Sequence, residues 1–239
     1  AAYPYPKYAQ SVVADFIFGG MENISATTLT ENVLQDERAF PDYQSAGDGL
    51  VAHELAHQWF GDLLTCRDWS HAWLNEGFAT YFDALFTESY YGLDEFRYQL
   101  FLNAEAYFDE DNRRYRRPIV HNVYHEPIDI RGDDLWWKAL RFYVERNRER
   151  VVITPEFQRA IEEATGRNLD WFFDQWVYRG GHPRFKVAWE WNDAAKLAKV
   201  TVSQTQNVDD LTPLFRMPVV VDYALDSGER VACRIEDSE

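Results

Sequence analysis

Hydrophobic and polar residues follow several different periods along the chain, and each period predicts a different kind of element. β-Branched and aromatic residues from Ser11 to Phe18 indicate a strand that is ended by Gly19 and Gly20. A polar stretch over residues 35–48 separates this strand from segments whose apolar residues recur at helical spacing. The helices predicted from that spacing cover residues 49–64, 74–91 and 93–108.

In the second half of the chain, the pattern of apolar and polar residues changes from helical spacing to alternation near residue 183. Thr154-Pro155-Glu156 is typical of a helix start, with Thr154 as the N-cap, and Gly166 suits the end of that helix. The helices predicted in this half cover residues 133–150, 154–166 and 168–178. Beyond residue 183, apolar and polar residues alternate as in antiparallel strands over residues 185–191, 198–204, 217–225 and 230–235. The pattern as a whole predicts an α+β protein that is mainly helical before its strands begin.

Composition and charge narrow the class of protein. Of the 239 residues, 46% are hydrophobic and 16% aromatic, which is enough for a sizeable core. The chain has 24 Lys and Arg against 40 Asp and Glu, and its net charge is −16. Nucleic-acid binding depends on neutralising phosphates with basic residues, so this charge argues against a nucleic-acid partner.

Neither the cysteines nor the ends of the chain indicate a compartment. Cys66 and Cys233 form no CxxC pair, so neither a disulfide framework nor a cysteine-type zinc site is indicated. No apolar run approaches the roughly 18 residues that mark a transmembrane helix. The sequence opens at Ala1 in mid-pattern and without a signal peptide. The localisation therefore stays undecided.

The strongest chemical signal is His53-Glu54-Leu55-Ala56-His57. Residues four apart return to nearly the same face of a helix, so His53 and His57 can meet one metal ion with Glu54 beside the open coordination position. A catalytic zinc takes a third protein ligand, and Glu76, separated from His57 by eighteen residues on the next predicted helix, supplies a carboxylate. The sequence thus predicts one zinc ion per chain, held by His53, His57 and Glu76.

This arrangement favours metal-assisted hydrolysis, with Glu54 as the general base that takes a proton from water and returns it to the leaving amine. Thr80 and Asp83 lie on the face of the second helix that carries Glu76, and they are candidates for hydrogen bonds to the ligands, although surface polar groups are an equal alternative. Aromatic residues that flank the motif are expected to pack the two helices together: Trp59, Phe60, Trp73 and Phe78.

Three motifs together resemble the aminopeptidase N family of zinc exopeptidases. They are His53 to Asp62 (HELAHQWFGD), Trp73 to Tyr81 (WLNEGFATY) and Gly20-Met21-Glu22-Asn23, and the similarity continues through Gly181-His182-Pro183. The resemblance implies a thermolysin-like (gluzincin) zinc-peptidase domain over residues 1–183, followed by the start of a small antiparallel β-sandwich domain over residues 184–239. It also implies that the full-length protein has an N-terminal β domain and a C-terminal helical domain that are missing here.

The resemblance further assigns the substrate's free α-amino group to Glu22, and peptides with a free N-terminus as substrates. A carboxylate near the metal distinguishes a terminal ammonium from an internal amide because it accepts a charge-assisted hydrogen bond. Gly19 and Gly20 would let the substrate backbone lie close along the strand, and Met21 and Asn23 complete the expected binding segment.

The chain departs from the family at one catalytic element. A tyrosine that stabilises the oxyanion is expected about sixty residues after the third ligand, in a Tyr-x-Lys-Gly-like segment that opens a helix, and none stands there. We expect an internal deletion near residues 130–131 that removes about twenty residues. Tyr124 and Tyr143 flank the gap outside the family motif, so neither is assigned this role.

Two alternatives to a zinc aminopeptidase stay open. One is an inactive or incomplete zinc-binding relative, because an oxyanion donor is typically worth on the order of 10²–10³ in rate. The other is a zinc endopeptidase, against which Glu22 argues because a fixed carboxylate at the amine position penalises an uncharged internal amide.

Overall fold

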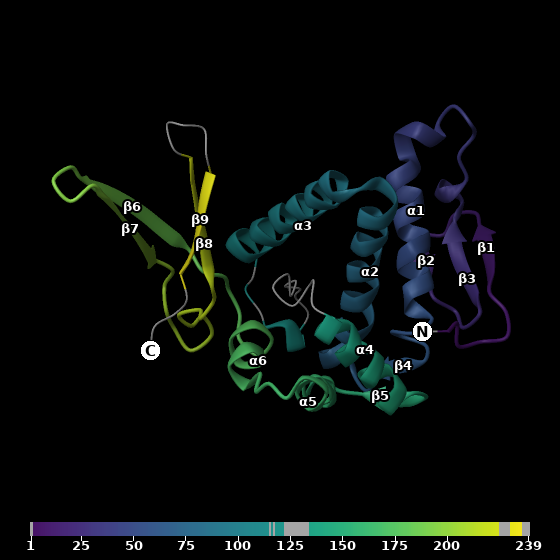
Figure 1. Cartoon of the computed structure of the whole chain (residues 1–239). Helices are drawn as coiled ribbons and strands as arrows, with labels where there is room; N and C mark the ends of the chain where they lie inside the picture. Colours follow the sequence, from purple (N-terminus) through teal and green to yellow (C-terminus); the bar gives the residue numbers. More distant parts are fainter. Residues whose placement is uncertain (1, 115, 117, 122–133, 225–229, 236–239) are drawn as a thin grey trace. The chain divides into compact units, whose positions relative to one another are not determined.

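The computed structural model describes residues 2–114, 116, 118–121, 134–224 and 230–235. Helices and strands are mixed, and the α+β prediction is confirmed. The chain divides into two compact units, Ala1–Tyr178 and Arg179–Glu239, and Figure 1 shows that the helices belong to the first of them.

The N-terminal segment forms a small sheet of order β1-β3-β2, from β1 (Ala9–Val13), β2 (Gly20–Met21) and β3 (Ala26–Thr30). β1 pairs with β3 in parallel and β2 pairs with it antiparallel. The predicted strand from Ser11 to Phe18 is wrong beyond Val13, because the chain turns there with Asp15 at a φ of 56°. Its apolar residues Ile17 and Phe18 are exposed instead of paired. A short 3-10 helix, η1 (Glu31–Val33), follows β3.

The helix α1 (Phe40–His57) is longer at its start and shorter at its end than the predicted helix over 49–64. It begins inside the polar stretch. Pro41 is tolerated in the first turn because a backbone N–H there has no acceptor within the helix. It ends at His57 because the chain turns back through Gly61, whose φ is 145°, into β4 (Leu64–Cys66).

The next two helices confirm the predicted ones, α2 (Trp73–Tyr91) and α3 (Leu93–Arg113), although α3 continues beyond the predicted end at residue 108. A short 3-10 helix, η2 (Trp69–His71), leads into α2. α1 and α2 lie side by side in Figure 1, and they run antiparallel, since His57 contacts Glu76 near the start of α2 and Gly49 packs on Asp83 further along it.

The remaining elements of the first unit are η3 (Ile119–His121), α4 (Asp134–Asn147), β5 (Arg150–Val152), α5 (Thr154–Thr165) and α6 (Asp170–Trp176). β5 pairs in parallel with β4. Thr154 is the first residue of α5 and not its N-cap; the preceding Ile153 takes the cap position, and its N–H donates to the Glu156 carboxylate at 2.9 Å. Gly166 ends the helix in the left-handed region, as predicted.

Aromatic side chains form the core of this unit. Phe60 stacks on Phe78 with ring centroids 4.4 Å apart, and Phe157 lies edge-on to Phe78 at 5.2 Å and to Tyr143 at 5.0 Å. The predicted packing residues Phe60 and Phe78 are therefore buried between the end of α1 and the start of α2. This cluster connects the helix pair to α4 and α5.

The second unit consists of two antiparallel hairpins, β6 (Phe185–Asn192) with β7 (Leu197–Gln204) and β8 (Val219–Ala224) with β9 (Arg230–Ile235). All four predicted strands are present, paired two by two. Along β6 the side chains of Val187, Trp189 and Trp191 share one face and are exposed. Among the described residues, no helix is long and apolar enough to cross a membrane.

The expected deletion near residues 130–131, together with Tyr124, lies outside the described residues. Tyr143 is described and is 1% exposed within the core, where burial raises the pKa of its hydroxyl.

Replacing the central aromatic residue of the core tests this packing. We expect Phe157→Ala to lower the free energy of unfolding by about 3–5 kcal/mol, because it leaves a cavity among rigid rings. Denaturant titration monitored by circular dichroism measures the change. Phe101→Ala, at an exposed position on α3, is the matched control and should change it by less than about 0.5 kcal/mol. Equal effects of the two changes would contradict the assignment of the core.

A histidine joins the start of α2 to the start of α5. The Nδ1 atom of His71 accepts the backbone N–H of Thr154 at 3.3 Å and lies 2.9 Å from its hydroxyl, which also accepts the indole N–H of Trp73 at 2.8 Å. Because a backbone N–H only donates, Nδ1 must be unprotonated in this arrangement. Burial also lowers the pKa of His71 from 6.5.

We therefore expect His71 to make stability depend on pH. The unfolded chain binds more protons than the folded chain near this histidine's ordinary pKa, so the free energy of unfolding should fall as the pH falls from about 7.5 to about 5.5. His71→Asn keeps an acceptor but does not titrate, and its stability should fall less over the same range. Denaturant titrations of both proteins across this range measure the difference. Parallel pH profiles would contradict the assignment.

Candidate metal centre and cleft

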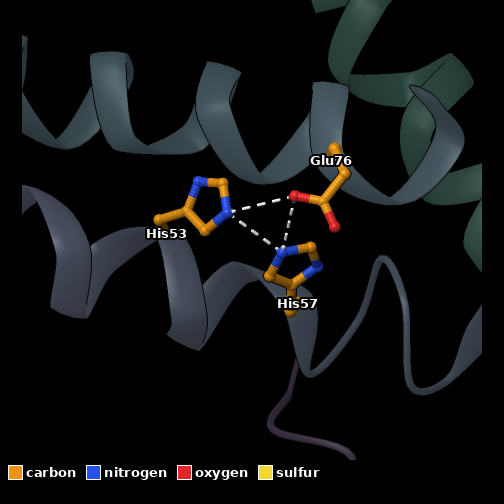
Figure 2. A group of neighbouring side chains, drawn as sticks. All are labelled: His53, His57 and Glu76. Atoms are coloured by element: carbon orange, nitrogen blue, oxygen red, sulfur yellow. Dashed lines mark hydrogen bonds and ion pairs between the residues drawn. The ribbon is translucent and has the colours of Figure 1, made fainter. Parts of the chain in front are cut away.

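Two imidazoles lie one helical turn apart at the end of α1. Figure 2 shows the two rings facing each other, and a hydrogen-bonding distance separates their Nε2 atoms: His53 Nε2 lies 3.0 Å from His57 Nε2. His57 is 1% exposed, and its Nδ1 lies 2.9 Å from the carbonyl oxygen of Phe60. A carbonyl can only accept, so Nδ1 carries a hydrogen and Nε2 is the nitrogen that faces the cluster.

The third group comes from the first turn of α2. Glu76 Oε2 lies 3.4 Å from Nε2 of both histidines (Figure 2). The neighbouring Asn75 fixes this turn, because its side-chain oxygen accepts the backbone N–H of Cys66, at the end of β4, at 3.0 Å. The antiparallel helix pair thus brings together the three residues that the sequence predicted as ligands.

The donor set of this cluster suits a divalent metal such as zinc. One ligand atom from each of His53, His57 and Glu76 can be chosen so that all lie within 4.8 Å of one another. Two imidazole nitrogens and one carboxylate oxygen, with room for a further ligand, are typical of catalytic zinc sites. The same charges act on each other: hydrogen bonds from His53 and His57 lower the pKa of Glu76 to about 2. Burial lowers the pKa of His57, but the hydrogen bond to Glu76 and the charge of Glu22 outweigh it and raise the pKa to about 9.

Glu54 lies beside this cluster with an unusual environment for a carboxylate. It is 4% exposed, and among the described residues its Oε2 atom has no hydrogen-bond partner. Burial raises the pKa of Glu54 to about 7, and the nearby histidines counteract only part of this shift. Gly20 on β2 permits the position, because a Cβ atom there would collide with the Glu54 carboxylate. A carboxyl group with such a pKa can both take and release a proton near neutral pH.

A cleft of about 810 Å³ contains all these groups. Its wall includes Gly20, Met21 and Glu22 from the segment predicted to bind substrate. The other residues of the wall are Phe18, Gly49, Leu50, His53, Glu54, His57, Thr65, Cys66, Arg67, Asp68, Trp69, Ala72, Asn75, Glu76 and Asp83.

Gly19 and Asn23, also predicted to bind substrate, lie outside this wall and have structural contacts. Gly19 adopts a φ of 82°, and its carbonyl accepts the N–H of Thr30 at 2.7 Å. The side-chain amide of Asn23 donates to the hydroxyl of Thr28 at 3.0 Å. Both residues therefore shape the turn that carries Glu22.

Of the two residues suggested as partners of the ligands, Asp83 lines the cleft and Thr80 does not. The Asp83 carboxylate packs over Gly49 on α1 and accepts a hydrogen bond from Gln99 at 2.8 Å. No tyrosine is found among the described residues of the cleft wall.

Two polar residues at the end of α1 were missed in the sequence. Gln58 is 0% exposed and bonds to the backbone of the turn after β2, and Asp62 accepts a hydrogen bond from it at 2.8 Å. The position of Gln58 directly after His57 was a usable signal, since a buried amide must have partners.

Comparison with known proteins shows which family this sequence is similar to. The family profile "Peptidase family M1 domain" matches residues 1–132. Aminopeptidase M1-A of Oryza sativa subsp. japonica is 30% identical over 231 residues, which cover 85% of this chain and 25% of that protein. Puromycin-sensitive aminopeptidase of Caenorhabditis elegans is 29% identical over 87% of this chain and 24% of its own length, and aminopeptidase Ey of Gallus gallus is 47% identical over 37% of this chain and 9% of its own.

The chain belongs to peptidase family M1, the aminopeptidase N family. It spans about a quarter of the length of the relatives M1-A and the Caenorhabditis elegans enzyme.

Proposed function

We propose that this chain is the catalytic region of a zinc aminopeptidase that removes the N-terminal residue from peptides. The observation that carries the proposal is the convergence of His53, His57 and Glu76 in one cleft with the buried carboxylate of Glu54. Membership of a family whose relatives are named aminopeptidases supports the same conclusion.

His53, His57 and Glu76 would hold one zinc ion through two Nε2 atoms and a carboxylate oxygen. The Nδ1 hydrogen bond of His57 to Phe60 supports this assignment, because it leaves the Nε2 lone pair of the neutral ring directed at the cluster. Zinc bound here would supply Lewis-acid chemistry, polarising the scissile carbonyl and making water more acidic.

Glu54 is the general base in this proposal. Its unpartnered Oε2 atom accepts a proton from the attacking water, and the same carboxyl group then delivers that proton to the nitrogen of the leaving amine. The raised pKa supports this double role, since neither the protonated nor the ionised form is strongly disfavoured near neutral pH.

Glu22 is the proposed anchor for the substrate's terminal ammonium, with Gly20 and Met21 along the same edge of the cleft. Its charge acts on Glu54 and His57, which supports a position close to the reacting groups. A charge-assisted hydrogen bond from the ammonium would fix the first peptide bond of the substrate next to Glu54.

We also propose that residues 1–183 form the thermolysin-like (gluzincin) domain of the family and that residues 184–239 begin its β-sandwich domain. The antiparallel helix pair that carries the cluster and the two antiparallel hairpins support these assignments. The remaining three quarters of the relatives' length would hold the N- and C-terminal domains of the full-length protein.

The alternative is a relative that binds zinc and peptide ends but has little turnover. The observation that favours it is the lack of a tyrosine in the described part of the cleft wall, since a missing oxyanion donor typically costs on the order of 10²–10³ in rate. The activity measurement below separates the two functions.

The metal assignment predicts one zinc ion per chain after dialysis, measured by plasma mass spectrometry. Removing a residue that only hydrogen-bonds to a metal ligand typically lowers metal affinity roughly 10–100-fold. His57→Ala removes a ligand itself, so we expect it to lower the zinc affinity by more than this. Competition with a chelating dye gives the affinity. His71→Asn removes an imidazole outside the cluster and should leave the zinc content unchanged; equal zinc content in His57→Ala and wild type would contradict the assignment.

The general-base assignment predicts that the zinc-loaded chain hydrolyses aminoacyl-arylamides and that Glu54→Gln lowers the rate at least about 100-fold. Release of the arylamine is followed by absorbance. Glu105→Gln on the exposed face of α3 is the matched control and should keep the wild-type rate. Hydrolysis no faster than that of Glu54→Gln would instead favour the binding-only alternative.

The same assay with an N-acetylated substrate separates an aminopeptidase from an endopeptidase. Acetylation removes the positive charge that Glu22 would recognise, so we expect cleavage to be lost. Equal cleavage of acetylated and free substrates would identify an endopeptidase.

A further inference from the structure

Gln58 is a fully buried amide that follows directly on His57, and both atoms of its amide have hydrogen-bond partners. Its Oε1 atom accepts the backbone N–H of Ser25 at 2.8 Å. The hydroxyl of Tyr3 lies 3.0 Å from Oε1 and 3.1 Å from the carbonyl of Lys7, and these two acceptors share its one hydrogen. Its Nε2 atom donates to the carbonyl of Glu22 at 3.1 Å and to the carboxylate of Asp62 at 2.8 Å. A side-chain amide has two donor hydrogens, and the Glu22 carbonyl and the Asp62 carboxylate take both.

These partners fix the orientation of the amide. The Ser25 N–H can only donate and the Glu22 carbonyl can only accept, so a flipped Gln58 would place donor against donor and acceptor against acceptor. The one-residue spacing from His57 places this oriented group at the end of the helix that carries the cluster.

The turn held by Gln58 is short and strained. Ala26 N–H donates to the Asn23 carbonyl at 2.9 Å, which closes the turn, and Ser25 adopts a φ of 60°, in the left-handed region that a serine rarely occupies. Gln58 bonds to the Glu22 carbonyl directly before this turn and to the Ser25 N–H within it. The backbone that carries the Glu22 side chain is thereby attached to α1.

We propose that Gln58 is a positioning residue that sets the distance between the ammonium-binding carboxylate of Glu22 and the metal-binding end of α1; this rests on the proposed function of Glu22. Glu22 directly follows the two-residue strand β2 at the cleft, and α1 carries His53, Glu54 and His57. An exopeptidase needs a fixed spacing between the ammonium and the reacting carbonyl, and a misplacement of about 1 Å can cost on the order of 100-fold. Gln58 therefore contributes to recognition of the peptide end without touching the peptide.

A pair of inhibitors isolates this effect in the zinc-loaded chain. Leucine hydroxamate has a metal-binding group and an ammonium, whereas 4-methylpentanohydroxamate has the same side chain and metal-binding group but no ammonium. The ratio of their inhibition constants measures recognition of the ammonium, and the second constant alone measures the metal site. Zinc content gives the same control by an independent route.

We expect Gln58→Glu to lower the preference for the ammonium-bearing inhibitor by at least about 10-fold, because a carboxylate keeps the acceptor for Ser25 but has no N–H for the Glu22 carbonyl. Zinc content and binding of 4-methylpentanohydroxamate should stay at their wild-type values. Gln58→Asn keeps the amide but is one methylene shorter, so it should show the same loss of preference. This second variant tests the inference if the buried charge of Gln58→Glu prevents folding.

Glu22→Gln separates failure of this inference from failure of the proposed function. If Glu22→Gln lowers the preference and the Gln58 variants keep it, the positioning role is overturned while the Glu22 anchor stands. If wild type has no preference, or Glu22→Gln leaves it unchanged, the anchor itself is overturned, and the role of Gln58 with it. Equal loss of both inhibitors in the Gln58 variants would show a general structural role and would also overturn the inference.

Discussion

The register between α1 and α2 is the constraint on which the site depends, because two of its clustered groups come from one helix and the third from the other. A shift of either helix by one turn, about 5.4 Å, would separate Glu76 from the imidazoles that now lie 3.4 Å away. The stacked rings of Phe60 and Phe78 maintain that register close to the cluster. Asn75 adds a second restraint by bonding to β4. The packing of the core therefore determines the geometry of the metal cluster in this chain.

The same packing gathers acidic groups that repel one another. Glu22, Glu54 and Asp62 all lie near the end of α1, and burial raises the pKa of Glu54 and of Asp62 to about 7. Such an arrangement costs stability unless a cation is present to offset the charges. A divalent metal and a substrate ammonium are the two cations that the proposed function would bring into the cleft, and either one would offset the repulsion among these carboxylates.

The residues of the cluster could be predicted from the sequence because their geometry is largely local. His53 and His57 are placed by the period of one helix, and Glu76 follows on the next helix after a short connection. The prediction of a strand as far as Phe18 was wrong because local β propensity does not indicate the turn at Asp15. The helix α1 begins earlier than predicted because a polar segment can become helical when it extends a packed helix. Gln58 was missed because its backbone partners, at Glu22 and Ser25, lie more than thirty residues earlier in the chain, and only the tertiary structure brings them together.

The parallel pairing of β4 with β5 also has a consequence for the order in which the cleft is made during synthesis. Thr65 and Cys66, which belong to the cleft wall, pair with Val151 and Val152. When a ribosome has exposed the chain only as far as α3, both helices that carry the metal cluster have emerged, but the strand that pairs with this wall has not. Closing such a long loop is slow compared with forming neighbouring helices. A nascent chain would thus have its metal-binding groups before it has a complete cleft.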